Sequence, residues 1–411
     1  MSGGEQARAQ RPEAARRLLL ARALVGLAAA GVLALWAEEA AARWLSAGVL
    51  GLAAVWALER LRRPAPPEVS PALIPLAGAA LWGPVQWAAG ATVDPAATLR
   101  AALSWWTLLA VVWLALEALA EREVLERALE WLLWFGFLLC AVSTLCLFTS
   151  GGRVFWIVES GYRDRVAGPF VYWNNYAAFI ETLLPAALVR ALGEARWPAP
   201  AAMAAVFYAS MVASGSRAGT VIAGAETALV LALWLRRPGV EKRGALARAA
   251  ALGGLLAGAT AAVGVERLLA RFGQPDPYAG RRELLEASLE MARARPWLGW
   301  GLGSWPSVYP AYARFDPGSR IYMNHAHNDW AEWAAEGGWP LAGLLGALAL
   351  WSVPAALRSV WGVGVPAVLT HAALDYPTAR LPLAVWIFLL LGALAAWRKR
   401  EAECWKANRT D

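Results

Sequence analysis

Long apolar runs recur along nearly the whole chain, and polar positions gather between them. Each run has about twenty residues, enough to cross roughly 30 Å of hydrocarbon as a helix. The pattern predicts twelve spans, so we expect a single all-α, polytopic integral membrane domain over residues 1–411 with both ends on one side. The expected spans are 18–36, 44–58, 71–89, 99–119, 129–148, 174–192, 199–213, 218–235, 245–265, 329–349, 352–374 and 381–397.

Basic residues in the short connections orient this set. Arginines and lysines cluster before the first span and after the second, eighth and twelfth, all on one side of a twelve-span threading. Short basic connections stay in the cytoplasm. We therefore expect cytoplasmic termini, with residues 398–411 as a charged cytoplasmic tail, and two outer connections at 149–173 and 266–328.

The longer outer connection, 266–328, is predicted to form a large periplasmic loop between the ninth and tenth spans. Within it, RRELLEASLEMARARPW has apolar residues in roughly a helical stripe, at Leu284, Leu285, Leu289 and Met291. This pattern favours an amphipathic helix lying along the outer interface. The glycine-rich GWGLGSW that follows is expected to form a turn.

Composition fits a membrane protein and points to a phosphorylated substrate. The chain is 59% hydrophobic with a net charge of +7, and no basic cluster with stacking aromatics occurs on a soluble module, so nucleic acid is not indicated. Anionic membrane lipid is the simpler partner. Of the 38 basic residues, the lysines are Lys242, Lys399 and Lys406, and the rest are arginines. Arginine grips phosphate with a planar, two-pronged donor set.

The stretch NHAHNDWAEWAAEGGWP, residues 324–340, places two of the three histidines at the head of the tenth span. Asp329, with Glu332 three residues later, fits a weak capping box, so a helix is expected to begin there with His327 just before its first turn. The exposed backbone N–H groups favour a neutral imidazole at that position, and a neutral imidazole can accept a proton. The same helix end can hold an anion.

Three interpretations of this stretch stay open: catalysis or substrate binding, a structural cap, and a metal site. The candidate metal ligands are His325, His327, Asp329 and Glu332. No zinc motif such as H-E-x-x-H occurs. We therefore expect no metal, and favour catalysis or substrate binding.

Further arginines are expected at the outer face, where polar residues near the hydrocarbon are costly. Arg165 lies in RDRVAGPF, Arg217 in SGSRAG and Arg281 in AGRRELL. The alternative to a functional role for Arg217 is that its side chain snorkels from the end of a span to the membrane interface. The outer face therefore gathers the arginines that the anchoring of spans does not require.

Two polar pairs lie at the ends of spans. Asn174 and Asn175 begin the sixth span, where amides commonly cap helices. His371 and Asp375 in HAALDYPTARLP are four residues apart, so they are expected to share a helix face. The carboxylate could then orient the imidazole, or the two could form a structural pair.

Five segments, in this order, carry a resemblance to a known family. GPFVYWNNYAAFIETLLP, SGSRAG, GRRELLEASLEMARARPWLGWGLGSW, HAHNDWAEWAAEGGWPLAG and HAALDYPTARLP resemble the signature segments of the O-antigen ligase and O-antigen polymerase superfamily, over roughly residues 165–391. Members of that family are polytopic enzymes that transfer glycans from an undecaprenyl diphosphate carrier to an acceptor on the periplasmic side. The resemblance implies a GT-C type glycosyltransferase architecture in the bacterial inner membrane, with a periplasmic active site.

The resemblance also implies roles for individual residues. The family's His-Asn motif falls on His327 and Asn328, and its Ser-Arg motif falls on Ser216 and Arg217. Its Gly-Arg motif falls on Gly280 and Arg281. His327 is then the expected catalytic base. The expected substrate-binding residues are Arg217, Arg281, Arg165, Asn328, His371 and Asp375.

The implied reaction needs a base near an acceptor hydroxyl and fixed positive charge near a departing diphosphate. One histidine and two or three arginines suffice, so we expect a metal-independent, inverting glycosyltransferase without a cofactor. The leading expectation is an O-antigen ligase with lipid A core as acceptor. Two alternatives stay open: an O-antigen polymerase, which HAALDYPTARLP resembles more closely, and a protein O-oligosaccharyltransferase. A lipid-linked glycan transporter is disfavoured, because the polar residues concentrate at one face.

Overall fold

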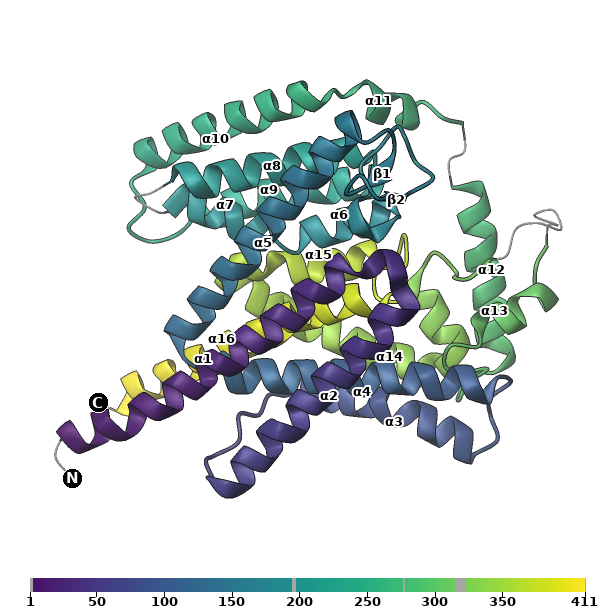
Figure 1. Cartoon of the computed structure of the whole chain (residues 1–411), viewed down its shortest axis with the longest axis horizontal. Helices are drawn as coiled ribbons and strands as arrows, with labels where there is room; N and C mark the ends of the chain where they lie inside the picture. Colours follow the sequence, from purple (N-terminus) through teal and green to yellow (C-terminus); the bar gives the residue numbers. More distant parts are fainter. Residues whose placement is uncertain (1–2, 194–196, 276–277, 315–322, 411) are drawn as a thin grey trace.

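The structure, a computed structural model, describes residues 3–193, 197–275, 278–314 and 323–410. Helices dominate it, and both termini lie at the same end of the molecule (Figure 1). At the opposite end lie the short elements α11 (Glu266–Phe272), α12 (Ala279–Ala294), α13 (Trp305–Val308), β1 (Arg153–Val154) and β2 (Val158–Glu159). This arrangement agrees with the all-α prediction, apart from one small hairpin described below.

The first five predicted spans are confirmed as helices or helix groups. They are α1 (Gly3–Leu33) with the 3-10 turn η1 (Leu35–Ala37), α2 (Glu38–Arg62), α3 (Leu73–Ala88), α4 (Pro95–Ala118) and α5 (Arg122–Thr149). The local chemistry at α4 shows why a helix begins where it does: the Asp94 side chain accepts a hydrogen bond from Ala97 N at 2.9 Å, and Pro95 occupies the first helical position.

The middle of the chain also follows the predicted pattern, with one subdivision. The sixth span is two consecutive helices, α6 (Trp173–Glu181) and α7 (Leu184–Gly193), separated just before Pro185. Proline has no backbone N–H, so it commonly marks such a break. The next three spans are α8 (Pro198–Ser214), α9 (Arg217–Leu235) and α10 (Lys242–Val263).

The predicted boundary between the tenth and eleventh spans is wrong. Helix α14 (Asp329–Ser359) continues through residues 349–352, and the turn comes at Val360, whose φ is 65°. The short η4 (Trp361–Val363) and α15 (Gly364–His371) then lead back, and α16 (Leu381–Thr410) ends the fold. The eight residues of α15 span only about 12 Å at 1.5 Å per residue.

Eight helices of the described chain are long and apolar enough to cross a membrane, and α8 is a shorter apolar helix. This makes the chain a multi-pass membrane protein. The full set of twelve crossings, the assignment of residues 1–411 to one domain and the GT-C architecture stay predictions. The eight candidates are Leu35–Arg62, Pro95–Ala118, Arg122–Thr149, Trp173–Gly193, Arg217–Leu235, Lys242–Val263, Asp329–Ser359 and Leu381–Cys404.

The two predicted outer connections contain short elements. The connection 149–173 holds an antiparallel hairpin, β1 (Arg153–Val154) with β2 (Val158–Glu159), followed by η2 (Gly168–Phe170). The connection 266–328 holds α11 (Glu266–Phe272), α12 (Ala279–Ala294), α13 (Trp305–Val308) and η3 (Tyr309–Ala311), with 276–277 and 315–322 outside the described residues. Helix α12 is the predicted amphipathic helix: Leu284 and Met291 are buried and Arg282 is exposed.

The GWGLGSW segment forms the predicted turn, and a buried carboxylate fixes it against α14. Glu336 accepts hydrogen bonds from Gly303 N at 2.8 Å and Trp305 N at 2.9 Å. Beside it, α14 kinks at Gly338, with φ 73°, where a Cβ atom would lie 2.6 Å from Pro296 O. Only glycine tolerates both conditions. Gly338 therefore allows the segment between α12 and α13 to pack closely against α14, the helix that begins beside His327.

Candidate functional site

His327 lies immediately before α14, in a strained backbone conformation. Its φ is 51°, in the left-handed region that costs a non-glycine residue on the order of 1 kcal/mol. The next residue, Asn328, caps the helix by accepting a hydrogen bond from Ala331 N at 3.0 Å, and its Nδ2 donates to Ala373 O at 2.8 Å. The strained histidine is therefore held between the start of α14 and the segment that follows α15.

Asp375 orients the imidazole of His327 from across the chain. His327 Nδ1 lies 3.2 Å from Asp375 Oδ1, and the Asp375 side chain is 1% exposed whereas that of His327 is 27% exposed. An ionised carboxylate can only accept hydrogen bonds, so Nδ1 carries the proton and donates. The Nε2 atom then keeps its lone pair, which makes it the nitrogen that can take a proton from a substrate.

Three more side chains surround the Asp375 carboxylate. Its Oδ2 accepts hydrogen bonds from Tyr172 Oη at 3.0 Å, from Arg281 Nη2 at 2.9 Å and from Asn174 Nδ2. Burial alone would raise the pKa of Asp375, but the hydrogen bond with His327 and the positive charge of Arg281 outweigh burial and lower it. Asp375 therefore stays ionised, and it joins the histidine to an arginine.

A second link runs from Asp375 to the start of α9. The Asn174 amide, which donates to Asp375, accepts a hydrogen bond from Ser216 Oγ at 2.8 Å. Ser216 is the N-cap of α9 and also accepts from Gly219 N at 3.2 Å. The predicted Ser-Arg motif is thus connected to the histidine, with Arg217 as the first residue of the helix.

Four arginines gather beside this network, and two aromatic rings hold them in pairs. The guanidinium groups of Arg165 and Arg271 lie 4.4 and 5.3 Å from the ring centre of Trp173. Those of Arg217 and Arg281 lie 5.0 and 5.9 Å from that of Tyr278. Cation–π contacts of this kind offset part of the repulsion between like charges.

The other three arginines lie close enough to Arg271 to affect its pKa. The pKa of Arg271 is lowered, first by burial and then by the positive charges of Arg165, Arg217 and Arg281. Asp375 pairs with Arg281, and Asp164 pairs with Arg165 at 2.6 Å. Two carboxylates against four arginines leave an excess of positive charge, which is the environment that an anion requires.

Sequence reasoning missed Arg271, Tyr172 and Asn174 as members of this cluster. Arg271 Nη1 donates to Gly215 O at 2.6 Å, and Arg217 Nη1 donates to Arg271 O at 2.9 Å, so α11 and the start of α9 are tied together. Arg271 stands in VERLLARF, which has no motif to distinguish it from other loop arginines. The available signal was its place in the outer connection.

Several capping predictions are wrong in detail. Asn328, not Asp329, caps α14, whereas Asp329 is buried and accepts from Thr378 N at 2.9 Å and Thr378 Oγ1 at 2.7 Å. Asn174 does not cap α6 but bonds to Asp375, as described above. Asn175 is buried, and its side-chain amide has no hydrogen-bond partner among the described residues. A substrate-binding role for Asn328 stays a prediction, although its side-chain oxygen and nitrogen both already form hydrogen bonds with backbone atoms.

His371 and Asp375 do not form the expected side-chain pair. The His371 side chain is fully buried, and its Nδ1 lies 2.7 Å from Glu181 Oε1 on α6. Asp375 lies in the turn beyond the end of α15, where it faces His327. The fold therefore separates the two residues into different carboxylate–imidazole pairs. A substrate-binding role for His371 stays a prediction.

His325 stands on the far side of Tyr376 from the arginines. The Tyr376 ring stacks on His325 at 4.5 Å and meets His327 edge-on at 4.8 Å. Beyond His325 opens a cleft of about 980 Å³, bounded by the start of α2 and by α4. Its polar lining includes Glu38, Glu39, Arg43, Arg100, Asn324 and His325.

The four candidate metal ligands do not form one cluster: His325 pairs with Glu332, whereas His327 and Asp329 have other partners. His325 Nδ1 lies 2.9 Å from Glu332 Oε1, His327 faces Asp375, and Asp329 binds Thr378. Among the described residues, no group of three His, Cys, Asp or Glu side chains is placed to hold a metal ion. These carboxylates hold histidines and loops in position.

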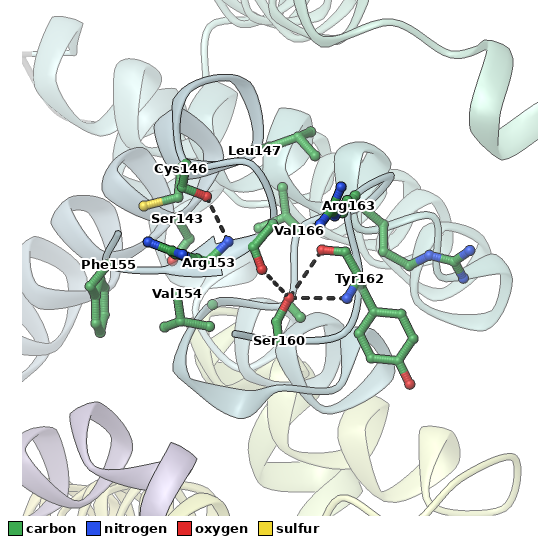
Figure 2. Close-up of a pocket in the computed structure, with 15 residues that line it drawn as sticks. Ser143, Cys146, Leu147, Arg153, Val154, Phe155, Ser160, Tyr162, Arg163 and Val166 are labelled. Atoms are coloured by element: carbon green, nitrogen blue, oxygen red, sulfur yellow. Dashed lines mark hydrogen bonds between the residues drawn. The ribbon is translucent and has the colours of Figure 1, made fainter. Parts of the chain in front are cut away.

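The hairpin connection carries Arg165 and borders a small cavity. Ser160 Oγ donates to Gly152 O at 2.7 Å and accepts from Tyr162 N at 3.2 Å, which closes the loop on itself (Figure 2). The enclosed space is about 30 Å³, room for about one water molecule. The loop therefore serves to position Arg165, which follows Tyr162 closely in sequence.

Comparison with protein families matches residues 201–346 to O-antigen ligase. Over these residues the chain is similar to the O-antigen ligase and O-antigen polymerase superfamily. The matched segment runs from α8 to just beyond the kink in α14, so it contains Arg217, Arg271, Arg281 and His327. Asp375, which joins the histidine to an arginine, lies outside it. A comparison with curated proteins gave no match.

Proposed function

We propose that this protein is an O-antigen ligase. It transfers a glycan from undecaprenyl diphosphate to lipid A core at the periplasmic face of the bacterial inner membrane. His327 is the base, and Arg165, Arg217, Arg271 and Arg281 bind the diphosphate. The observation that carries this proposal is the shared carboxylate: Asp375 contacts His327 with one oxygen and Arg281 with the other.

The shared carboxylate fixes the distance between proton acceptor and anion site. In the proposed step, an acceptor hydroxyl oxygen bonds to the anomeric carbon of the donor while the bond from that carbon to the diphosphate oxygen breaks. The bonding electrons leave with the lipid diphosphate, and the hydroxyl proton passes to His327 Nε2. A single displacement of this kind inverts the anomeric configuration.

The arginines supply the positive charge that many glycosyltransferases take from a divalent metal. Their guanidinium groups are held by Trp173 and Tyr278 before any substrate arrives. Pre-positioned charge of this kind stabilises a leaving group without reorganisation during the reaction. The proposed reaction is therefore metal-independent and needs no cofactor.

The cleft beyond His325 is the proposed entry for the acceptor. It adjoins the histidine loop on the side opposite the arginines, and its carboxylates, arginines and amide suit sugar hydroxyls. The alternative acceptor is a second lipid-linked repeat unit, which would make the protein an O-antigen polymerase; the polymerase-like segment HAALDYPTARLP contains Asp375 and Tyr376 and supports this candidate. Protein hydroxyls are the third class of acceptor.

The test uses purified protein with an undecaprenyl-diphosphate glycan and, separately, lipid A core or a second carrier-linked unit. Transfer to lipid A core that is lost in His327→Ala would support the ligase, whereas lengthening on the carrier would identify a polymerase. Full activity in His327→Ala would contradict the assignment of the base. Activity that collapses with chelator and returns with one divalent ion would contradict the metal-independent mechanism.

A further inference from the structure

Another cavity lies between α5, α7 and α16 and shares no lining residue with the arginine cluster. The start of α5 and the end of α16, which line it, lie toward the end of the molecule that holds both termini (Figure 1). Its volume is about 540 Å³, within the usual range of roughly 300–1,000 Å³ for small-molecule sites. Residues of α5, α7, η4 and α16 line it. Nothing in the proposed glycosyl transfer uses this cavity.

One end of this cavity is basic. Arg122 from α5, Arg190 from α7 and Arg400 from α16 line it together with Glu126 and Glu401. Three arginines against two carboxylates leave one positive charge in excess among these described residues. Arg122 is paired with Glu126 at 2.6 Å, and Arg190 Nη2 donates to the Glu126 backbone oxygen at 3.2 Å.

Arg400 supplies the observation that points to a ligand. Its Nη1 atom is buried, and no hydrogen-bond acceptor for it exists among the residues that the structure describes. A buried donor without an acceptor is uncommon, and a charged one is more costly than a neutral one. The position of Nη1 in a basic cavity indicates that an anionic oxygen normally completes its hydrogen bonds.

The other wall of the cavity is apolar. Leu125 and Leu129 from α5 and Val189 from α7 line it, and Trp361 and Trp397 complete it. Tryptophan is enriched where membrane helices meet the headgroup layer. A charged end beside an apolar wall suits a molecule that carries a phosphate and a hydrocarbon chain, rather than a free ion.

We propose that this cavity binds an anionic phospholipid, with the lipid phosphate on Arg400 and a hydrocarbon chain along Leu125, Leu129 and Val189. Basic pockets between membrane helices are known to take such headgroups. The guanidinium group of Arg400 offers a charge-assisted hydrogen bond to a phosphate oxygen. The lipid would join α5, α7 and α16 at this end of the bundle. This proposal does not depend on the proposed glycosyl transfer.

The test measures lipid binding to the full-length, detergent-purified protein by native mass spectrometry and by thermal unfolding. Phosphatidylglycerol and phosphatidylcholine with the same chains are titrated in parallel. We expect phosphatidylglycerol to bind more tightly and to raise the unfolding midpoint further. In Arg400→Gln we expect phosphatidylglycerol affinity to fall about tenfold, because one charge-assisted hydrogen bond is lost.

Two further variants separate this effect from a general loss of charge or of folding. Arg127→Gln removes the same charge from an exposed position on α5 that does not line the cavity, and should bind phosphatidylglycerol as the wild type does. Val189→Trp fills the apolar wall and leaves the arginines in place, and should weaken binding as Arg400→Gln does. If both cavity variants bind the lipid with wild-type affinity, the proposal is wrong.

Two control ligands test the class of ligand. Equal binding of phosphatidylcholine and phosphatidylglycerol by the wild type would overturn the requirement for an anionic headgroup. Inorganic phosphate that raises the unfolding midpoint as much as phosphatidylglycerol, and competes with it, would overturn the lipid assignment in favour of a soluble phosphate site. Selective binding of phosphatidylglycerol that phosphate does not displace supports the proposal.

Discussion

Two histidine–carboxylate pairs in this protein are chemically alike and differ in their surroundings. His327 with Asp375 and His371 with Glu181 both join Nδ1 to a carboxylate oxygen, at 3.2 and 2.7 Å. The His327 side chain is 27% exposed, whereas His371 and Glu181 are both fully buried. Access to a substrate therefore separates the two pairs, although their geometry does not.

The partners of each carboxylate sharpen the difference. Asp375 has additional donors in Tyr172, Asn174 and Arg281, and it therefore connects its histidine to the arginine cluster. Glu181 Oε2 and His371 Nε2 have no hydrogen-bond partner among the described residues. A histidine paired with a carboxylate is thus not a catalytic base by itself; it also needs an open nitrogen and charge beside it.

Removing the partly exposed His327 side chain should produce the largest change in activity. We expect His327→Ala to lower the transfer rate by about a thousandfold, the typical contribution of a general base. The unfolding midpoint should stay near that of the wild type, because the side chain is partly exposed and Asp375 keeps its hydrogen bonds with Tyr172, Asn174 and Arg281. Glycan transfer and thermal unfolding, measured on the same preparation, check both parts. A large loss of stability would show that the His327–Asp375 pair has a structural role, like the His371–Glu181 pair.

Removing the fully buried His371 side chain should lower the stability of the fold instead. We expect His371→Leu to destabilise the protein by about 3 kcal/mol, because Glu181 is left buried without its partner. The double variant His371→Leu with Glu181→Leu should recover much of this loss, since neither member of the pair is then buried without its partner. Denaturant unfolding of both variants is the measurement. Folded His371→Leu protein that is stable but inactive would assign this pair to catalysis.

Asp375→Asn tests whether Asp375 orients the imidazole of His327. An amide can donate to Nδ1 and so favours the wrong tautomer of His327, which places the proton on Nε2. We expect about a hundredfold lower transfer rate, with a smaller change in the KM of the donor. Steady-state kinetics on the folded variant check this expectation. A variant as active as the wild type would show that His327 does not depend on Asp375.

Arg271→Gln tests whether the arginine missed by sequence reasoning binds the donor. Losing one charge-assisted contact to phosphate should raise the KM for the donor about tenfold and leave the KM for the acceptor unchanged. Arg267→Gln, an exposed position on the same helix α11, is the matched control and should behave as the wild type does. Equal kinetics for the two variants would remove Arg271 from the site.

The third histidine gives the smallest effect, and it depends on pH. Burial alone would lower the pKa of His325, but the charge and hydrogen bond of Glu332 raise it to about 9. A raised pKa in the folded state means that this pair stabilises the fold fully below about pH 6.5 and loses its effect as the pH rises through about 9. His325→Gln should lose on the order of 1 kcal/mol at pH 7 and little at pH 10. Unfolding at both pH values measures it; equal losses would contradict it.

The sequence predicted the helices well, because apolar runs long enough to cross a membrane have few other uses. It misplaced the end of α14, since residues 349–352 contain no glycine or proline to end a helix there, and the helix continues to Ser359 and ends at Val360. It predicted His327, Arg217 and Arg281 as site residues from local motifs, and that prediction still awaits a test. Their geometry depends on pairings between distant segments, such as 327 with 375, and no local pattern records which carboxylate faces which histidine.

The distribution of histidines also gives the protein a built-in set of spectroscopic probes. Each of its three imidazoles has its own carboxylate: His325 has Glu332, His327 has Asp375 and His371 has Glu181. Isotope labelling of histidine alone would therefore produce three ring signals, from the proposed acceptor cleft, the proposed base and the interior. One spectrum could then distinguish an event at the reaction centre from a change in the packing of the bundle.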